Sequence, residues 1–191
     1  MSVFKKLISK ILNKEEEKEL TSVQLGDRLK NADLDYKFAQ LFTHAGGYFN
    51  YCADEAEALQ DLNNILKLEG VNSVFCFDED LQKFLDVVNV SYTENLELIN
   101  DCAFITCEYL IAYDGRIMLS SNNIRHFPRA SLPDKIVVMA NISQIVANLH
   151  DAMTKVKRRG SLKNLTSISG NISELDSDAT TTKLFLLLLE D

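Results

Sequence analysis

The sequence predicts an α/β domain built on a largely parallel β-sheet. Helical and strand-like segments alternate along most of the chain, which is the pattern of α/β domains with parallel sheets. Two strand-like runs, at residues 136–139 and 184–189, are apolar at successive positions, as is typical of strands covered on both faces. The 191 residues are 46% hydrophobic and 25% charged, the composition of a folded globular domain.

Residues 1–33 are expected to form an N-terminal segment ahead of an α/β domain at residues 34–191. Residues 3–12 place apolar side chains at helical spacing, and the lysines on or beside the other face are Lys5, Lys6, Lys10 and Lys14. This pattern predicts a short basic amphipathic helix, and the charged stretch at 15–19 predicts a linker. Weak peripheral contact of residues 1–14 with an anionic membrane explains such a helix, and docking on the protein's own body or on a partner explains it equally well.

The first half of the domain is predicted to alternate helices with strands. In chain order the pattern gives a helix at 36–42, a strand at 48–51, a helix at 54–68 and a strand at 73–77. Gly46-Gly47 marks the end of the first helix. Asp78 caps a further helix, because its carboxylate accepts hydrogen bonds from free N–H groups of the first turn.

The second half contains the strongest turn signal. The dipeptide Asp114-Gly115 between apolar runs predicts a tight hairpin, and residues 103–113 before it are expected to hold one or two strands. A strand is predicted at 136–139, and Asn141 is expected to open a helix that carries Ile142, Ile145, Val146, Leu149, Met153 and Val156. The polar stretch at 161–183 predicts a long loop. The run at 184–189 predicts a strand at the centre of the sheet.

Charge and motif content disfavour several function classes. The net charge of −8, from 20 Lys and Arg against 28 Asp and Glu, disfavours nucleic-acid binding, which depends on basic surface. No glycine-rich phosphate-binding motif occurs, and the four cysteines lack the spacing of zinc or iron–sulfur sites. The sequence therefore predicts neither a protein-bound metal nor a cofactor. Cysteines without a secretory signal predict a cytoplasmic location.

The charges are distributed unevenly. Residues 51–101 hold 12 Asp and Glu against 2 Lys, whereas residues 152–173 hold five cations and no acid. These five are Lys155, Lys157, Arg158, Arg159 and Lys163. Two solvated faces explain the pattern, and so does a basic stretch that meets an anionic ligand or partner.

Three places carry residues suited to binding or catalysis. Glu108 and Arg116 flank the predicted hairpin, where a guanidinium group suits bidentate contact with a carboxylate or phosphate and a carboxylate suits acid–base chemistry. A surface ion pair explains Arg116 equally well. Gly46-Gly47 is explained by a helix end, and residues 167–178 form a hydroxyl-rich loop that either orders around an anion or simply connects two elements.

Several segments resemble the lactate-utilisation domain family (LUD, LutC/YkgG-like). The sequence I-A-Y-D-G-R-I-M-L-S-S at 111–121 is similar to the family segment I-A-[DE]-T-G-T-[LIV]-V-L-x-S. Residues 42–48, 132–138 and 144–146 resemble further elements of the family, and Ile168-Ser169-Gly170 resembles its I-S-G-P-S loop. The final strand corresponds as well, so that the resemblance extends over residues 36–191.

The resemblance implies a three-layer α/β/α fold similar to the ribose-5-phosphate isomerase, glucosamine-phosphate deaminase and CoA-transferase group. It also implies an association with bacterial lactate-oxidation complexes, whose iron–sulfur clusters belong to other subunits. The site-like positions that carry over are Gly115, Ser120, Ser169, Gly170 and Asp176. Asp114 and Arg116 replace two family threonines, Asn171-Ile172 replaces Pro-Ser, and a late G-V-H-G-P segment is absent, so a reduced member of the family is expected.

Three functions are consistent with these residues. The first is an accessory or regulatory protein linked to lactate utilisation. The second is a protein or enzyme that binds a hydroxy acid, a sugar phosphate or a CoA derivative, with Glu108 as the catalytic candidate. Its expected ligand-binding residues are Gly115, Arg116, Ser120, Ser169 and Gly170. The third is a membrane-peripheral scaffold that uses residues 1–14. The sequence leaves open whether the protein is an enzyme.

Overall fold

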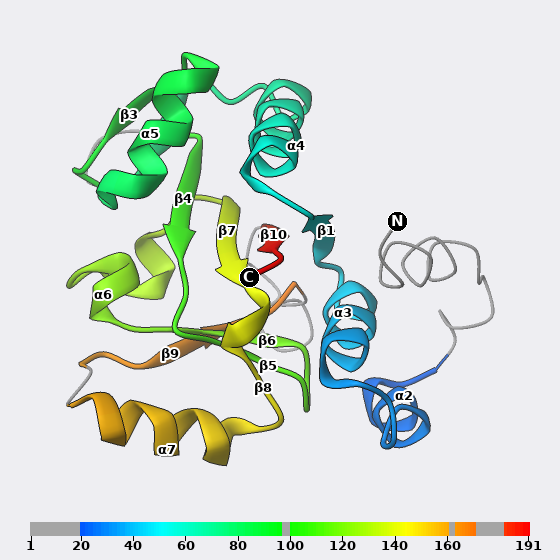
Figure 1. Cartoon of the computed structure of the whole chain (residues 1–191). Coiled ribbons are helices and arrows are strands. Elements are labelled where there is room, and N and C mark those ends of the chain that lie inside the picture. The colour runs from blue at the N-terminus through cyan, green and yellow to red at the C-terminus, as the bar shows by residue number, and fades with distance from the viewer. Residues whose placement is uncertain (1–19, 97–99, 161–162, 171–181) are drawn as a thin grey trace.

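A six-stranded parallel β-sheet organises the part of the chain that the computed structural model describes, residues 20–96, 100–160, 163–170 and 182–191 (Figure 1). This main sheet has the order β1-β10-β7-β4-β2-β3. Its strands are β1 (Tyr48–Cys52), β2 (Ser73–Phe75), β3 (Ser91–Thr93), β4 (Cys102–Thr106), β7 (Lys135–Asn141) and β10 (Lys183–Leu189). The predicted parallel sheet is confirmed. β10 pairs with β1 on one side and β7 on the other, so its predicted place inside the sheet is confirmed too.

Helices cover the main sheet on both faces. Side chains of β4, β7 and β10 alternate, so that Phe104, Val137 and Leu187 face α4 (Glu55–Leu68) and α5 (Glu79–Val88). Their neighbours Ile105, Val138 and Leu186 face α3 (Leu34–His44), the short α6 (Ser121–Ile124) and a second sheet. Both faces are buried, which explains the uninterrupted apolar runs. The architecture is the expected three-layer α/β/α arrangement, and Asp54 and Asp78 cap α4 and α5.

A second, four-stranded sheet packs against the main sheet and was not predicted as a separate unit. Its order is β8-β5-β6-β9, with β8 at Ile145–Val146, β5 at Tyr109–Ile111, β6 at Arg116–Leu119 and β9 at Thr166–Ile168. β5 and β6 form the predicted antiparallel hairpin around Asp114-Gly115. Helix α7 (Leu149–Arg159) covers the outer face of this sheet, where Tyr109, Met118 and Val156 meet in a third apolar cluster.

Two predictions in the second half are wrong. Asn141 does not open a long helix: it caps a 3₁₀ turn at Ile142–Gln144, then Ile145–Val146 pair with β5, and Asn148 caps α7. Pairing with β5 buries Val146, so a tertiary contact decides the structure of residues whose apolar spacing also suits a helix. The stretch at 161–183 is not entirely loop, because β9 pairs with β6.

Helix α2 (Ser22–Arg28) is an element that the sequence analysis did not predict. Thr21 and Gln24 form a capping box at its start, and Leu25 is buried beneath it. The helix expected at residues 3–12 lies outside the described residues. No helix within the described ranges combines the length and the apolar character needed to cross a bilayer.

Two glycines let the second sheet approach the backbone of its neighbours. Gly115 has a φ of +70°, and a Cβ atom there would lie 2.5 Å from the backbone nitrogen of Phe42 in α3. At Gly170 a Cβ atom would lie 2.6 Å from the backbone carbon of Gly46. Backbone atoms cannot move aside as the end of a flexible side chain can, so both positions require glycine.

We expect Gly115→Ala to lower the free energy of unfolding by about 3 kcal/mol, since it combines a left-handed backbone with a backbone clash. Gly70→Ala is the matched control, because Gly70 has a φ of +63° but open space around it. The control is expected to lose about 1 kcal/mol. Urea unfolding followed by circular dichroism measures both. Equal losses would show that the clash with α3 contributes nothing.

Candidate functional site

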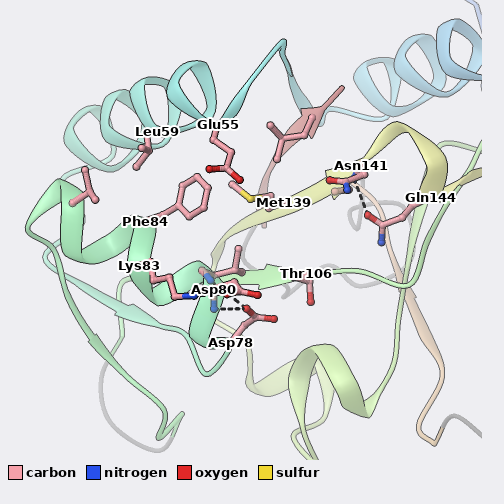
Figure 2. A pocket seen from close by; sticks show the side chains of 14 residues that line it. Glu55, Leu59, Asp78, Asp80, Lys83, Phe84, Thr106, Met139, Asn141 and Gln144 are labelled. Atoms are coloured by element: carbon pink, nitrogen blue, oxygen red, sulfur yellow. Dashed lines mark hydrogen bonds and ion pairs between the residues drawn. The ribbon is translucent and has the colours of Figure 1, made fainter. Parts of the chain in front are cut away.

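A cleft of about 680 Å³ opens at the carboxyl ends of β4, β7 and β10 (Figure 2). Thr106, Asn141 and Leu189 lie at these strand ends, and the first turns of α4 and α5 form the opposite wall. Ligands of open parallel α/β sheets bind outside the carboxyl ends of the strands, because loops and helix N-termini converge there. We call this site the strand-end cleft.

The α4 and α5 side of the strand-end cleft combines apolar with charged side chains, and the side towards the second sheet is polar. Leu59 and Phe84 extend from α4 and α5 towards Met139 of β7, while Thr106, Asn141 and Gln144 lie towards the second sheet (Figure 2). An apolar wall with a few polar groups is the usual lining of a small-molecule site, where the polar groups fix the orientation of the ligand.

Carboxylates outnumber cations along the cleft. Glu55, Asp78 and Asp80 line it, and Lys83, the one cation among the described residues that line it, is paired with Asp80 at 2.6 Å. The Oδ1 atom of Asp78 accepts hydrogen bonds from the backbone N–H groups of Asp80 and Leu81. The first turn of α5 is therefore already capped by a carboxylate. The electrostatic environment of the cleft is unfavourable for an added anion.

The first turn of α4 is capped in the same way. The Asp54 carboxylate accepts a hydrogen bond of 2.8 Å from the backbone N–H of Glu57. Free N–H groups at a helix N-terminus are the common binding site of a phosphate group in α/β proteins. Both helix N-termini beside the cleft are thus engaged by side chains of the protein itself.

A buried polar network lies behind Thr106. The hydroxyl of Ser120 donates to the carboxylate of Glu108 at 2.6 Å, and the side-chain amide of Asn122 donates to the same oxygen at 3.3 Å. The backbone N–H of Ser120 donates to Asn123, whose amide donates to the Thr106 hydroxyl at 3.1 Å. This network fixes the hydroxyl oxygen of Thr106 at the edge of the cleft.

Gln144 is fixed by both ends of its side-chain amide. Its Nε2 donates to the carbonyl oxygen of Cys107 at 2.6 Å, and its Oε1 accepts from the backbone N–H of Asn141 at 2.7 Å. Thr106 differs, because its hydroxyl accepts from Asn123 but donates to no acceptor among the described residues. Thr106 therefore offers a ligand a hydrogen-bond donor that is already held in place.

The predicted site residues fall into two groups, and neither lines the strand-end cleft. Glu108 and Ser120 are 7% and 0% exposed and contact one another in the buried network. Gly115 packs against α3, and the exposed Arg116 beside it pairs with Asp114 at 3.4 Å.

Ser169 and Gly170 lie just beyond the end of β9, whose last residue Ile168 pairs with Ile117, the neighbour of Arg116 in β6. Asp176 lies outside the described residues.

Sequence reasoning missed the residues that line the cleft. Asp78 follows directly on the run predicted as a strand at 73–77, Thr106 and Asn141 are the last residues of β4 and β7, and parallel strands end at one edge of their sheet. Polar residues at these three strand ends were the available signal.

The four cysteines are buried and unsuited to nucleophilic catalysis. Burial raises the pKa of Cys52, Cys76 and Cys102 to about 12, and burial together with the charge of Glu108 raises the pKa of Cys107 further. A nucleophilic cysteine instead requires a lowered pKa and an exposed sulfur.

We expect the native protein to resist Ellman's reagent at pH 8, since a thiol of pKa 12 is a thiolate in about one molecule in ten thousand at that pH. Unfolding in urea is expected to expose all four thiols to rapid reaction. Absorbance at 412 nm measures the reaction. Rapid labelling of any thiol in the native protein would contradict the burial described here.

Comparison with known proteins gives two matches. The model of the LUD domain family matches residues 93–184. A crystal structure of a DUF162 family protein from Deinococcus radiodurans aligns with a TM-score of 0.64 at 17% identity, over 84% of this chain and 98% of that chain. At this identity the structural match supports the fold. No curated protein matches the chain.

Proposed function

We propose, from the premise that residues 93–184 belong to the LUD domain family, that this protein binds a small polar metabolite in the strand-end cleft. The observation that carries the proposal is the cleft itself, which at about 680 Å³ has the size of a small-molecule site. It joins an apolar wall to the prepositioned Thr106 hydroxyl.

The lining favours a neutral or cationic ligand that carries hydroxyl or amino groups. Glu55 and the second carboxylate oxygen of Asp78 are acceptors for such groups, while the apolar wall suits a carbon skeleton. Hydroxy acids and sugar phosphates carry negative charge, which the surplus of carboxylates opposes. A link to lactate utilisation would then not depend on lactate occupying this cleft.

A thermal-shift panel tests the proposal. It compares sugars, polyols and amines with lactate, sugar phosphates, nucleotides and CoA derivatives. A ligand at 100 times its Kd stabilises the native state by about 2.7 kcal/mol, which raises the Tm measurably. We expect a neutral or cationic compound to give this shift, and Thr106→Val to abolish it because valine keeps the shape and loses the hydroxyl.

Two further variants control the panel. Thr43→Val makes the same change at an exposed position of α3 and is expected to retain the full shift. Asp78→Asn keeps a good helix cap but replaces the second carboxylate oxygen with an NH2 group, so it is expected to weaken a cationic ligand, which loses an attracting charge, more than a neutral ligand, which loses only a hydrogen-bond acceptor. A panel without any shift, or an equal shift in Thr106→Val, would reject the cleft as the binding site.

A second candidate is the accessory or regulatory role that the family resemblance implies. It is favoured by the burial of Glu108 and Ser120, which contact one another and not the cleft, so neither is presented to a substrate. We expect purified protein not to oxidise lactate to pyruvate in a spectrophotometric assay with an artificial electron acceptor. Sustained turnover by the protein alone would remove this candidate.

A further inference from the structure

Helix α7 presents four cations that form no ion pair with an acidic side chain of the described chain. Its second half carries Lys155, Lys157, Arg158 and Arg159, all exposed. The ion pairs found among the described residues lie elsewhere. In a protein of net charge −8, four neighbouring cations that form no ion pair with the described residues make a local positive surface.

Two of these cations are held in place by an aromatic ring. Lys155 Nζ lies 5.7 Å and the Arg159 guanidinium carbon 5.5 Å from the ring centre of Tyr109 in β5. Tyr109 is 2% exposed and packs under α7. Because the two side chains are already ordered, binding of a partner costs less side-chain entropy.

A groove of about 330 Å³ lies beside the cations, between α7, β8 and the start of α3. Leu34, Ile145 and Ala147 give it an apolar lining, with Leu34 43% exposed, and Lys155 and Arg158 line it as well. Asp151 is the acidic residue of the groove, and its carboxylate accepts a hydrogen bond of 3.2 Å from Asn148. The groove thus combines an apolar floor with cationic edges.

We propose that this groove and the basic face of α7 dock an acidic segment of a partner protein, with one apolar side chain of that segment seated on Leu34, Ile145 and Ala147. Interaction of Lys and Arg with the helix dipole accounts for basic residues in the last turn of α7. It does not account for the adjoining apolar groove. Charge complementarity selects carboxylates as the groups that meet Lys155 and Arg158.

An anionic membrane is the weaker occupant of the same face. A lipid surface offers no single apolar side chain for the groove, and the overall charge of −8 opposes approach to anionic lipid. In Figure 1, α7 lies on the side of the second sheet that faces away from the main sheet, and its four cations are exposed among the described residues.

Fluorescence anisotropy with a labelled peptide of alternating Glu and Leu tests the proposal, and a Lys and Leu peptide of the same length is the charge-inverted probe. We expect saturable binding of the acidic peptide alone, weakened by salt. Arg158→Glu is expected to weaken it about tenfold, because the substitution replaces an attraction with a repulsion. Lys67→Glu makes the same charge change on α4 and is expected to leave binding unaltered.

A second variant of Arg158 and a comparison with lipid vesicles complete the test. Arg158→Gln removes the charge without reversing it and is expected to give an intermediate loss, which covers the case in which Arg158→Glu fails to fold. Vesicles of phosphatidylcholine with phosphatidylserine form the lipid arm. Failure to bind the acidic peptide, equal binding by Arg158→Glu and Lys67→Glu, or binding to vesicles but not to peptide would each overturn the proposal.

Discussion

Close contact between the second sheet and the corner formed by α3 and β1 is the constraint on which the rest of the molecule depends. The hairpin turn at Gly115 lies against the backbone of Leu41 and Phe42, and Gly170 lies against Gly46 and Gly47. These contacts leave no room for a Cβ atom, so the two sheets reach a distance at which their apolar faces share one core. Gly115 and Gly170, which were predicted as ligand-binding residues, therefore have a packing role in this fold.

That placement determines the geometry of the strand-end cleft. The chain leaves the main sheet at Thr106 and enters the second sheet at Tyr109, so Cys107 and Glu108 form the crossing. Hydrogen bonds from Ser120 and Asn122 hold the Glu108 carboxylate, and Gln144 donates to the Cys107 carbonyl. The polar wall of the cleft therefore adjoins the connection at Cys107 and Glu108. Hydrogen bonds from Ser120 and Asn122 fix Glu108, and a hydrogen bond from Gln144 fixes Cys107.

The sequence predicted the elements better than the assembly. Asp78, the Asp114-Gly115 turn and the run at 184–189 each have a local physical cause, and all three are confirmed. Residues 145–146 form a strand because they pair with β5. The spacing of apolar residues within 141–156 does not reveal that contact. The cleft was missed for the same reason, since Thr106 and Asn141 are 35 positions apart and meet only where β4 and β7 end side by side.

The layered fold separates the charges that the sequence distributes unevenly. Residues 51–101, with their surplus of acid, supply α4 and α5 on one face of the main sheet, while the cations of α7 lie beyond the second sheet. The segment from Gln144 to Ala147 contributes to both proposed sites, because Gln144 lines the cleft and Ile145 and Ala147 line the groove. Ile145 and Val146 pair with β5 and the Gln144 amide is hydrogen-bonded at both ends, so one short segment held in place by these bonds supplies side chains to both proposed sites.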